Sequence, residues 1–453
     1  MNRKILRASL FAFALTTLTA GQPARCAEPP TAPKTTLDRK TREEVFEIVW
    51  SRINERFFDP KFNGTDWGLM RRRYAPQAAE AATDQAFYEV LERMLGELRQ
   101  SHIGIIPPEA YADEEKEQDA ADRPGTVGLI AQWVEEKPII TRVAPGSPAA
   151  RAGLRPGYVL TAIGNLRMED LIPRLRKRAK TDRDFATYVR LTVPRLIDGA
   201  VDSDVTLEYL DGDDKPGTVT LKRVPVGGTV ARFGELPPMP VETEAKRLAG
   251  GIGYVRANIF MMPILEPIRK AVREMKDAPG IVLDLRGNPG GIGALANAIG
   301  GSFFATETNL GTMKLRRGNI NFLSYPQPTV YRGPLVILTD EGSVSTSEIL
   351  AGGFQEKGRA YVIGEATAGM VLPSVVEALP GGARLQYAFA DYRTPKGILL
   401  EGRGVLPNRR VSLTRAALLN GEDPALAEAI RYINAQAEAR RRRNPNKGVG
   451  KKP

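Results

Sequence analysis

Apolar positions recur at helical spacing in the first part of the chain. One such set is Val45, Val49, Ile53 and Phe57. This spacing predicts an amphipathic helix with one buried face. It follows the segment 41–44 (TREE), which is typical of a helix start in which a Thr and a Glu three residues later bond each other's backbone. Two further helices are predicted over 67–74 and 87–98, so the first region is helical.

The pattern changes beyond residue 250, where short apolar runs alternate with helical segments. The predicted strands cover 253–259, 281–285, 335–338 and 361–363. Helices are predicted over 264–275, from 347 to about 358, and over 423–440. Strands that alternate with helices indicate an α/β sheet.

Two of these strands run into turns that can carry chemistry. Ser343, Ser345 and Ser347 lie between a strand and a helix, where helix amides and the positive end of the helix dipole face any oxyanion formed there. A glycine-rich turn, 287–291, follows the strand at 281–285, and such a turn brings bare backbone amides close to a ligand. The plainer alternatives are serines that only cap the helix and a turn without function.

Taken together, DLRGNPGG (284–291) and SVSTSEILAGG (343–353) resemble the motifs of the carboxyl-terminal processing peptidases, the family of tail-specific proteases and the tricorn protease core. The resemblance implies an α/β, crotonase-like (ClpP/crotonase) protease core. Aligning the family's S-x-S-E motif places the nucleophile at Ser345. The other two serines then become turn and cap residues.

The resemblance also suggests which base activates the serine. One branch of the family uses a lysine where this chain has Met370, and a thioether cannot accept a proton. The tricorn-like branch uses Ser, His and Glu, and the single histidine here, His102, follows Ser101 as that branch requires. Glu401 matches the glutamate that orients the histidine. A lone histidine is otherwise more often a surface or core residue, which is the alternative.

The implied reaction is peptide-bond hydrolysis through an acyl-enzyme. His102 would act as base with an ordinary pKa near 6.5, and the oxyanion would bind the backbone amides of Thr346 and of Gly290 or Gly291. The main alternative is a catalytically degraded, PDZ-containing peptide-binding or scaffold protein. Met370 is the feature that favours it.

The segment 145–157 (PGSPAARAGLRPG) resembles a PDZ domain of the bacterial protease type. Such domains receive an extended peptide by strand addition and often hold its terminal carboxylate with backbone amides. The resemblance implies that Gly128, Leu129 and Ile130 supply this peptide-binding loop. A spacer that binds nothing is the alternative, and the basic segment 174–194 is an insertion of unknown role.

Charge and composition narrow the partners. The chain has 453 residues and a net charge of +11, enough length for two or three domains. Residues 1–27 carry four basic side chains and the tail from residue 440 carries seven, with no acidic ones in either. The body between them is therefore neutral, which argues against a nucleic-acid-binding face. One histidine and one cysteine cannot form a zinc site, so no metal and no cofactor are expected.

Residues 1–27 have a basic start and a short apolar run, which is typical of a cleaved secretory signal. Cleavage after Ala20 or as late as Ala27 is compatible with the sequence. The apolar run is too short for a membrane-spanning helix, so an exported protein without an integral membrane segment, periplasmic or extracellular, is expected. Cys26 lies in the predicted leader.

The predicted organisation has six parts. They are a signal peptide (1–27), a linker (28–39), an N-terminal helical cap region carrying Ser101 and His102 (40–122), a PDZ domain (123–225), a catalytic core (226–420) and a C-terminal helix with a basic tail (421–453). Protein or peptide substrates are the expected partners, and homo-oligomerisation is left open.

Overall fold

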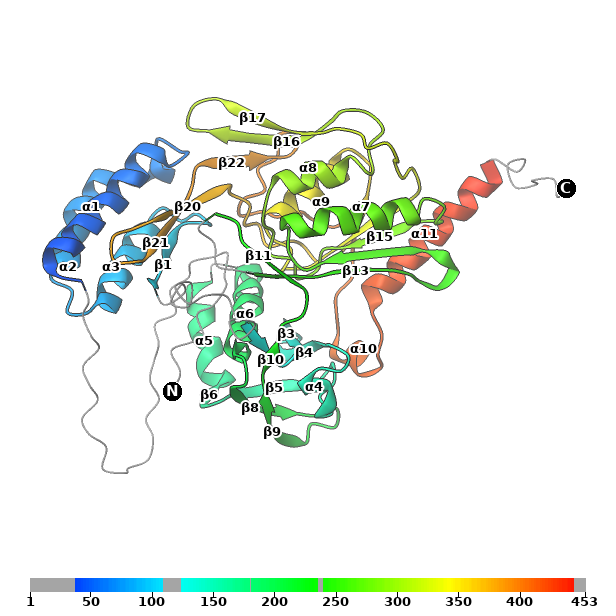
Figure 1. Cartoon of the computed structure of the whole chain (residues 1–453), viewed down its shortest axis with the longest axis horizontal. Helices are drawn as coiled ribbons and strands as arrows, with labels where there is room; N and C mark the ends of the chain where they lie inside the picture. The colour runs from blue at the N-terminus through cyan, green and yellow to red at the C-terminus, as the bar shows by residue number, and fades with distance from the viewer. Residues whose placement is uncertain (1–36, 109–123, 180, 235–238, 444–453) are drawn as a thin grey trace.

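The computed structural model describes residues 37–108, 124–179, 181–234 and 239–443. The predicted signal peptide and most of the predicted linker lie outside these residues. The described chain has a mixed α/β structure in which helices and sheets from three sequence regions pack together (Figure 1). In these four stretches, no helix is both long and apolar enough to cross a membrane.

The N-terminal region consists of three helices. They are α1 (Arg39–Arg56), α2 (Trp67–Ala79) and α3 (Asp84–Gly96). The start predicted at Thr41 is wrong, because α1 begins earlier: the Asp38 side chain accepts the Thr41 N–H and caps the helix. The apolar faces of these helices pack against a three-stranded sheet. Its strands, in spatial order, are β1 (Gly104–Ile106), β21 (Arg384–Ala388) and β20 (Ser374–Ala378).

A second sheet, with strand order β3-β4-β5-β8-β9, forms the core of the middle region. Its strands are β3 (Leu129–Val134), β4 (Lys137–Val143), β5 (Val159–Ile163), β8 (Asp204–Leu210) and β9 (Pro216–Lys222). Three helices share its core: α4 (Pro148–Arg151), α5 (Met168–Arg178) and α6 (Asp182–Ile197). The insertion noted at 174–194 thus forms the end of α5 and most of α6.

The largest sheet carries both candidate turns and has the order β13-β14-β15-β18-β19-β23. Its strands are β13 (Thr243–Arg247), β14 (Gly253–Ala257), β15 (Ile281–Asp284), β18 (Leu335–Thr339), β19 (Tyr361–Gly364) and β23 (Arg409–Arg410). All pairings from β14 to β23 are parallel, and only β13 pairs antiparallel.

Both faces of this sheet are covered, which explains the uninterrupted apolar runs in its strands. Leu283 and Ile337 share a core with α7 (Leu265–Glu274), α8 (Ala294–Gly300) and α9 (Thr346–Glu356). Val282 and Val336 point to the other face and pack on α11 (Pro424–Arg443). In Figure 1, α11 accordingly runs across the side of the sheet away from α7 and α8.

The remaining elements are short or lie at the periphery. A further three-stranded sheet pairs β17 (Asn319–Ser324), β16 (Thr308–Leu315) and β22 (Ala390–Arg393) in that order. The others are η2 (Phe62–Gly64), β2 (Pro124–Thr126), β6 (Leu166–Arg167), β7 (Gly199–Ala200), β10 (Val224–Pro225), β11 (Thr229–Ala231), β12 (Met239–Val241), η5 (Ala249–Gly251), η6 (Met262–Ile264) and α10 (Arg415–Leu419).

A buried ion network ties the end of β15 to α11. Asp284 is fully buried and accepts hydrogen bonds from Arg286 at 2.9 and 2.6 Å and from the Tyr254 hydroxyl at 2.8 Å. Arg286 also donates to both carboxylate oxygens of Asp423, at 2.9 and 2.8 Å. Burial alone raises the pKa of Asp284, but Arg286 and Arg256 outweigh it and hold that pKa below its usual range. The carboxylate therefore depends on its cationic partner.

Replacing Arg286 by Met is expected to lower the free energy of unfolding by about 3 kcal/mol, because it leaves Asp284 buried without its main counter-charge. The matched control is Arg39→Met, which breaks the exposed pair Arg39–Glu43 and should change stability little. Urea unfolding of the three proteins at pH 7 measures both effects. Equal stability of Arg286→Met and the wild type would show that the network is not stabilising.

Candidate active site

The candidate nucleophile lies where β18 ends and α9 begins. Because β15 and β18 are parallel neighbours, the turns after them meet at the same edge of the sheet, where ligands bind in such folds. Ser345 directly precedes α9, is half-buried, and has φ 54° and ψ −113°. A non-glycine residue seldom adopts this conformation, and it persists only where surrounding contacts enforce it. It is the geometry of a nucleophile turn.

The two neighbouring serines are committed to structural hydrogen bonds. Ser343 Oγ donates to the carbonyl of Leu285 at 2.8 Å, and Ser347 Oγ donates to the carbonyl of Asn288 at 2.9 Å. Both side chains are fully buried. Ser347 lies inside the first turn of α9, so the expectation that it caps the helix is wrong: Ser345 holds that position. The serines thus join the nucleophile turn to the glycine-rich turn.

Asn288 organises the glycine-rich turn. Its Oδ1 accepts the Gly290 N–H at 2.9 Å, and its Nδ2 donates to the Ala257 carbonyl at 2.8 Å. A Cβ atom on Gly290, where φ is +93°, would lie 2.7 Å from the Cβ of Ser345. Only glycine therefore lets the two turns approach this closely.

This geometry limits which backbone N–H groups can bind the oxyanion. The first N–H groups of a helix have no acceptor within it, so the Thr346 N–H is available beside Ser345. Of the two glycines that the sequence left open, Gly290 already donates to Asn288. For the Gly291 N–H, no acceptor exists in the described part of the chain. Gly291 is therefore the better second donor.

The structure brings Ser101, His102 and Glu401 together although the chain separates Ser101 from Glu401 by 300 positions. Ser101 Oγ lies 2.7 Å from His102 Nδ1 and donates to Glu401 Oε2 at 3.0 Å. The Ser101 N–H donates to Glu401 Oε1 at 2.9 Å, and the Val371 N–H donates to Oε2 at 2.9 Å. β1 follows His102 and pairs with β21. The sheet β1-β21-β20 therefore holds the segment with Ser101 and His102 in place.

This hydrogen-bond chain assigns the tautomer of His102. A serine hydroxyl has one hydrogen, and that of Ser101 goes to the carboxylate. The ring must then donate from Nδ1 to Ser101 Oγ, which leaves the lone pair on Nε2. Neutral His102 is thus prepared to accept a proton at Nε2.

Burial changes the basicity of His102. The side chain is 6% exposed, and burial lowers its pKa from 6.5 to about 3. The expectation of an ordinary pKa near 6.5 is therefore wrong, because the imidazolium would lose its hydration inside the protein. At neutral pH the ring is fully in the neutral form that a base requires.

The sequence interpretation assigned no role to Glu348, a fully buried carboxylate beside the candidate nucleophile. It accepts the N–H groups of Ser345, Gly369 and Met370 at 3.0, 2.7 and 3.0 Å, and the Thr367 hydroxyl at 2.6 Å. Burial raises its pKa to about 7 against the effect of these hydrogen bonds. Its position three residues after Ser345 is the capping-box spacing, which could have revealed it.

Met370 occupies the place of the lysine found in one branch of the resembled family. Its carbonyl accepts the Ser345 N–H at 3.0 Å. Its side chain is 7% exposed and packs with Val344 and with Tyr188 and Leu191 of α6. Within the described residues, no group of three or more His, Cys, Asp or Glu side chains could hold a metal ion.

The residues expected to bind a peptide end in the PDZ region lie at the start of β3. The Gly128 N–H donates to Thr126 Oγ1 at 3.0 Å, and the Gly128 carbonyl accepts the Ala144 N–H at 2.7 Å. Leu129 and Ile130 pair with β4. β3 is the edge strand of its sheet, as strand addition requires, but α6 packs against it.

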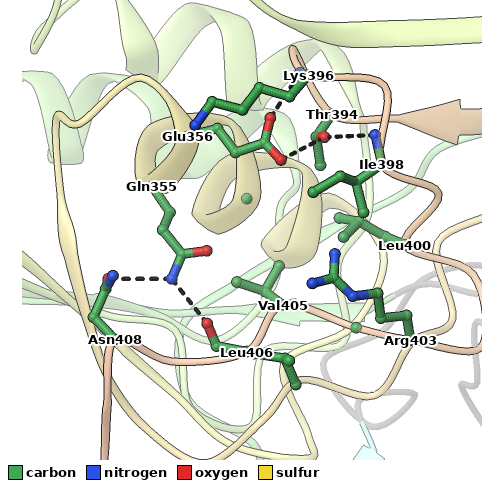
Figure 2. A pocket seen from close by; sticks show the side chains of 12 residues that line it. Gln355, Glu356, Thr394, Lys396, Ile398, Leu400, Arg403, Val405, Leu406 and Asn408 are labelled. Carbon is green, nitrogen blue, oxygen red and sulfur yellow. Dashed lines mark hydrogen bonds between the residues drawn. The ribbon is translucent and has the colours of Figure 1, made fainter.

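A cavity of about 290 Å³ lies behind α9, next to the segment that carries Glu401. Figure 2 shows Gln355 at its wall, donating from Nε2 to the Leu406 carbonyl at 2.8 Å and to Asn408 Oδ1 at 3.1 Å. On the other side, Glu356 accepts the Thr394 hydroxyl at 2.7 Å. None of Ser345, His102, Ser101 or Glu401 lines this cavity, so it is separate from the candidate catalytic groups.

Comparison with known proteins is consistent with this geometry. Residues 251–411 match the model of peptidase family S41, residues 38–96 the tricorn protease C1 domain, and residues 139–176 a PDZ domain. The chain is 29% identical over 380 residues to a carboxyl-terminal-processing protease of Picosynechococcus sp., covering 82% of this chain and 83% of that one. A protease of the same name from Synechocystis sp. is 27% identical over 367 residues, covering 80% and 79%.

A solved structure shares the fold. The photosystem II D1 C-terminal processing protease superimposes with a TM-score of 0.57 at 23% identity, covering 83% of this chain and 94% of that chain. The matched models span the N-terminal helices, the PDZ region and the sheet that carries both candidate turns. Residues 251–411 thus match peptidase family S41, and about four fifths of the chain is similar to carboxyl-terminal-processing proteases. The protein is a serine endopeptidase with a PDZ domain.

Proposed function

We propose that Ser345 is the nucleophile, His102 the base, and Ser101 with Glu401 the relay that orients the base. The observation that carries this proposal is the hydrogen-bond chain from Glu401 through Ser101 to His102 Nδ1, because it leaves Nε2 as the proton acceptor. The rare backbone conformation of Ser345 supports its choice over Ser343 and Ser347, whose hydroxyls are engaged.

In the proposed reaction, Ser345 Oγ attacks the carbonyl carbon of the scissile peptide while His102 Nε2 takes its proton. The N–H groups of Thr346 and Gly291 bind the oxyanion of the tetrahedral intermediate, and one such donor typically contributes about 3 kcal/mol. The C–N bond then breaks, and the leaving amine takes the proton from His102. Water, deprotonated by the same ring, hydrolyses the acyl-enzyme.

The finer architecture is part of the proposal. We assign residues 226–420 to a crotonase-like catalytic core and residues 40–122 to an N-terminal cap that delivers His102. The parallel strands β14 to β19 with helices on both faces support the first assignment. Pairing of β1 with β21 supports the second, because it ties the cap to the core. The PDZ boundaries 123–225 follow from the same division.

The proposal also covers the location of the protein and the class of its substrates. The basic start and apolar run of residues 1–27 support export, so proteins of the cell envelope or its surroundings are the proposed substrates. Curated relatives carry the name carboxyl-terminal-processing protease, which supports cleavage near substrate C-termini. β3 is the edge strand of the PDZ sheet, which supports recognition of an extended peptide end by strand addition.

The first test is labelling of the mature protein with a fluorophosphonate probe. Wild type should label, and Ser345→Ala and His102→Ala should not, because the first lacks the attacking oxygen and the second lacks its base. Turnover of a casein substrate should fall by about 10⁶-fold in either variant. Ser412→Ala, which removes a hydroxyl bound to Glu365 at 2.6 Å, serves as the control and should label normally.

The same assay separates the alternative function. A wild-type protein that binds peptides in a pull-down but neither labels nor turns over substrate would favour a degraded scaffold protein. Full labelling of His102→Ala would reject the assignment of the base.

Replacing Glu401 by Gln tests the relay. Glu401 accepts hydrogen bonds from the Ser101 hydroxyl and from the N–H groups of Ser101 and Val371. Glutamine keeps one acceptor oxygen, but its NH2 group would face an N–H donor, and the negative charge at the end of the relay is lost. This change should lower kcat by about 10⁴-fold. Glu365→Gln, which loses partners at Arg410 and Ser412, is the matched control and should keep its activity. Equal activity of both variants would argue against the relay.

The depressed pKa of His102 also predicts a pH dependence of stability. Below pH 6.5 this histidine is protonated in the unfolded chain, whereas in the folded protein it stays neutral down to about pH 3. The free energy of unfolding therefore falls as the pH drops. Between pH 7 and pH 5 the loss should be about 2 kcal/mol. His102 is the only histidine, so His102→Gln should lack this component. Urea unfolding at both pH values compares them, and identical slopes would contradict the buried neutral ring.

A further inference from the structure

α6 is firmly anchored in the PDZ region. It begins with a capping box between Thr181 and Asp184. Its apolar residues Phe185, Val189, Val193 and Ile197 share a core with Leu129 and Ala131 of β3. The Phe185 ring meets the ring of Trp133 edge-on, with centroids 4.8 Å apart. The helix is therefore part of the PDZ core and packs on the strand at its edge.

The opposite side of α6 touches the turn that leads to Ser345. Thr187 Oγ1 donates to the carbonyl of Glu341 at 3.1 Å. Tyr188 and Leu191 pack on the cluster of Val344, Ala368 and Met370. From the neighbouring strand β3, Gln132 Nε2 donates to Asp340 Oδ2 at 2.8 Å. The PDZ region thus contacts the residues directly before the candidate nucleophile.

Arg190 of α6 is wedged between the nucleophile turn and the glycine-rich turn. A Cβ atom on Gly287 would lie 1.9 Å from a terminal nitrogen of Arg190, and one on Gly342 would lie 3.2 Å from its Nε. Both glycine N–H groups donate to Asp340 Oδ1, at 2.7 and 2.9 Å. Asp340 therefore joins the two turns through hydrogen bonds, and Arg190 packs against both.

The positive charge of Arg190 compensates the neighbouring carboxyl groups of Asp340 and Glu341. Arg190 is 9% exposed, and its Nε has no hydrogen-bond partner among the described residues. Burial lowers the pKa of Arg190, whereas Asp340 and Glu341 favour its charged form. Burial and the neighbouring Asp340 raise the pKa of Glu341 to about 8. Without the guanidinium, two carboxyl groups would face each other with less compensation.

We propose that α6 supports the nucleophile turn from the PDZ region, and that Arg190 is a positioning residue for peptide hydrolysis. It acts through Gly342 and Asp340 on Ser345, and through Gly287 on the turn that presents the Gly291 N–H. This inference rests on the proposed roles of Ser345 and His102. It gives the inserted segment 174–194 a function in the reaction itself, in addition to its place in the PDZ core.

The test compares Arg190→Met, Arg190→Lys and the control Arg223→Met in the full chain. Arg223 is a buried cation of the PDZ region that donates to the carbonyls of Asp204 and of Ile197, the last residue of α6. Arg190→Met should lower kcat and the rate of fluorophosphonate labelling by about 10- to 100-fold, because small displacements of reacting groups are this costly. KM should change little, and Arg190→Lys should recover much of the rate.

The control separates positioning from general destabilisation. Arg223→Met should lose thermal stability and yet label at the wild-type rate below its melting temperature. Hydrogen exchange supplies a readout without activity: amides of 340–346 should exchange faster in Arg190→Met only. If that variant does not fold, Thr187→Val, which removes one bond to the turn, should show the same pattern more weakly.

Different outcomes would reject the positioning role of Arg190 and the proposed peptidase mechanism. Wild-type labelling and wild-type exchange in folded Arg190→Met would reject the positioning role and leave the proposed peptidase mechanism intact. Equal loss of labelling in Arg190→Met and Arg223→Met would reject it as well. A wild-type protein that never labels would reject the proposed mechanism, while faster exchange of 340–346 in Arg190→Met would still support the contact.

Discussion

The structure of the site depends on one hydrogen-bond chain between residues far apart in sequence. Ser101 connects its chain neighbour His102 to Glu401, which lies 300 positions further along the chain. Such a chain forms only if the N-terminal helices dock on the sheet β1-β21-β20, which includes strands from late in the chain. Docking buries His102, which lowers its pKa, while the hydrogen bond to Ser101 fixes its tautomer. Folding and proposed chemistry are thus linked through the same contacts.

A second set of contacts controls the backbone around Ser345. Glu348 fastens the Ser345 N–H to the segment 367–370, and Asn288 fastens the glycine-rich turn to β14 and to Ser347. Arg190 and Asp340 complete this frame from the side of the PDZ region. Strained backbone persists only where its surroundings over-determine it. The positive φ of Ser345 is therefore a consequence of several buried polar groups around it.

The position of Met370 fits this arrangement. In a branch that uses lysine as the base, this site carries an amine, whereas here Tyr188 and Leu191 of α6 cover a thioether. An ammonium in that contact would lose hydration without a partner of opposite charge among the side chains packed on it. The insertion in the PDZ region and the loss of the lysine are compatible for this reason. The proposed base, His102 of the N-terminal region, would remove the need for one at residue 370.

The sequence by itself determined the helical periodicity near residue 45, the buried strands at 281–285 and 335–338, and the two motifs that resemble those of the peptidase family. These features are local, since spacing, turn chemistry and short motifs depend on neighbouring residues. It also singled out Ser345, His102, Ser101 and Glu401, through resemblance. Their geometry could not be read from the chain, because contacts across 300 positions depend on how whole regions dock.

Only the tertiary structure decided the remaining features of the site. It showed that the Gly290 N–H donates to Asn288, which makes Gly291 the better candidate for the second oxyanion donor. It also showed that Asp38 starts α1 in place of Thr41, and that burial takes the pKa of His102 away from its ordinary value. Arg190 and Glu348 carry no local signal of their importance beyond a charge or a capping spacing. Their roles arise from burial and from partners supplied by other regions, which are properties of the packed chain.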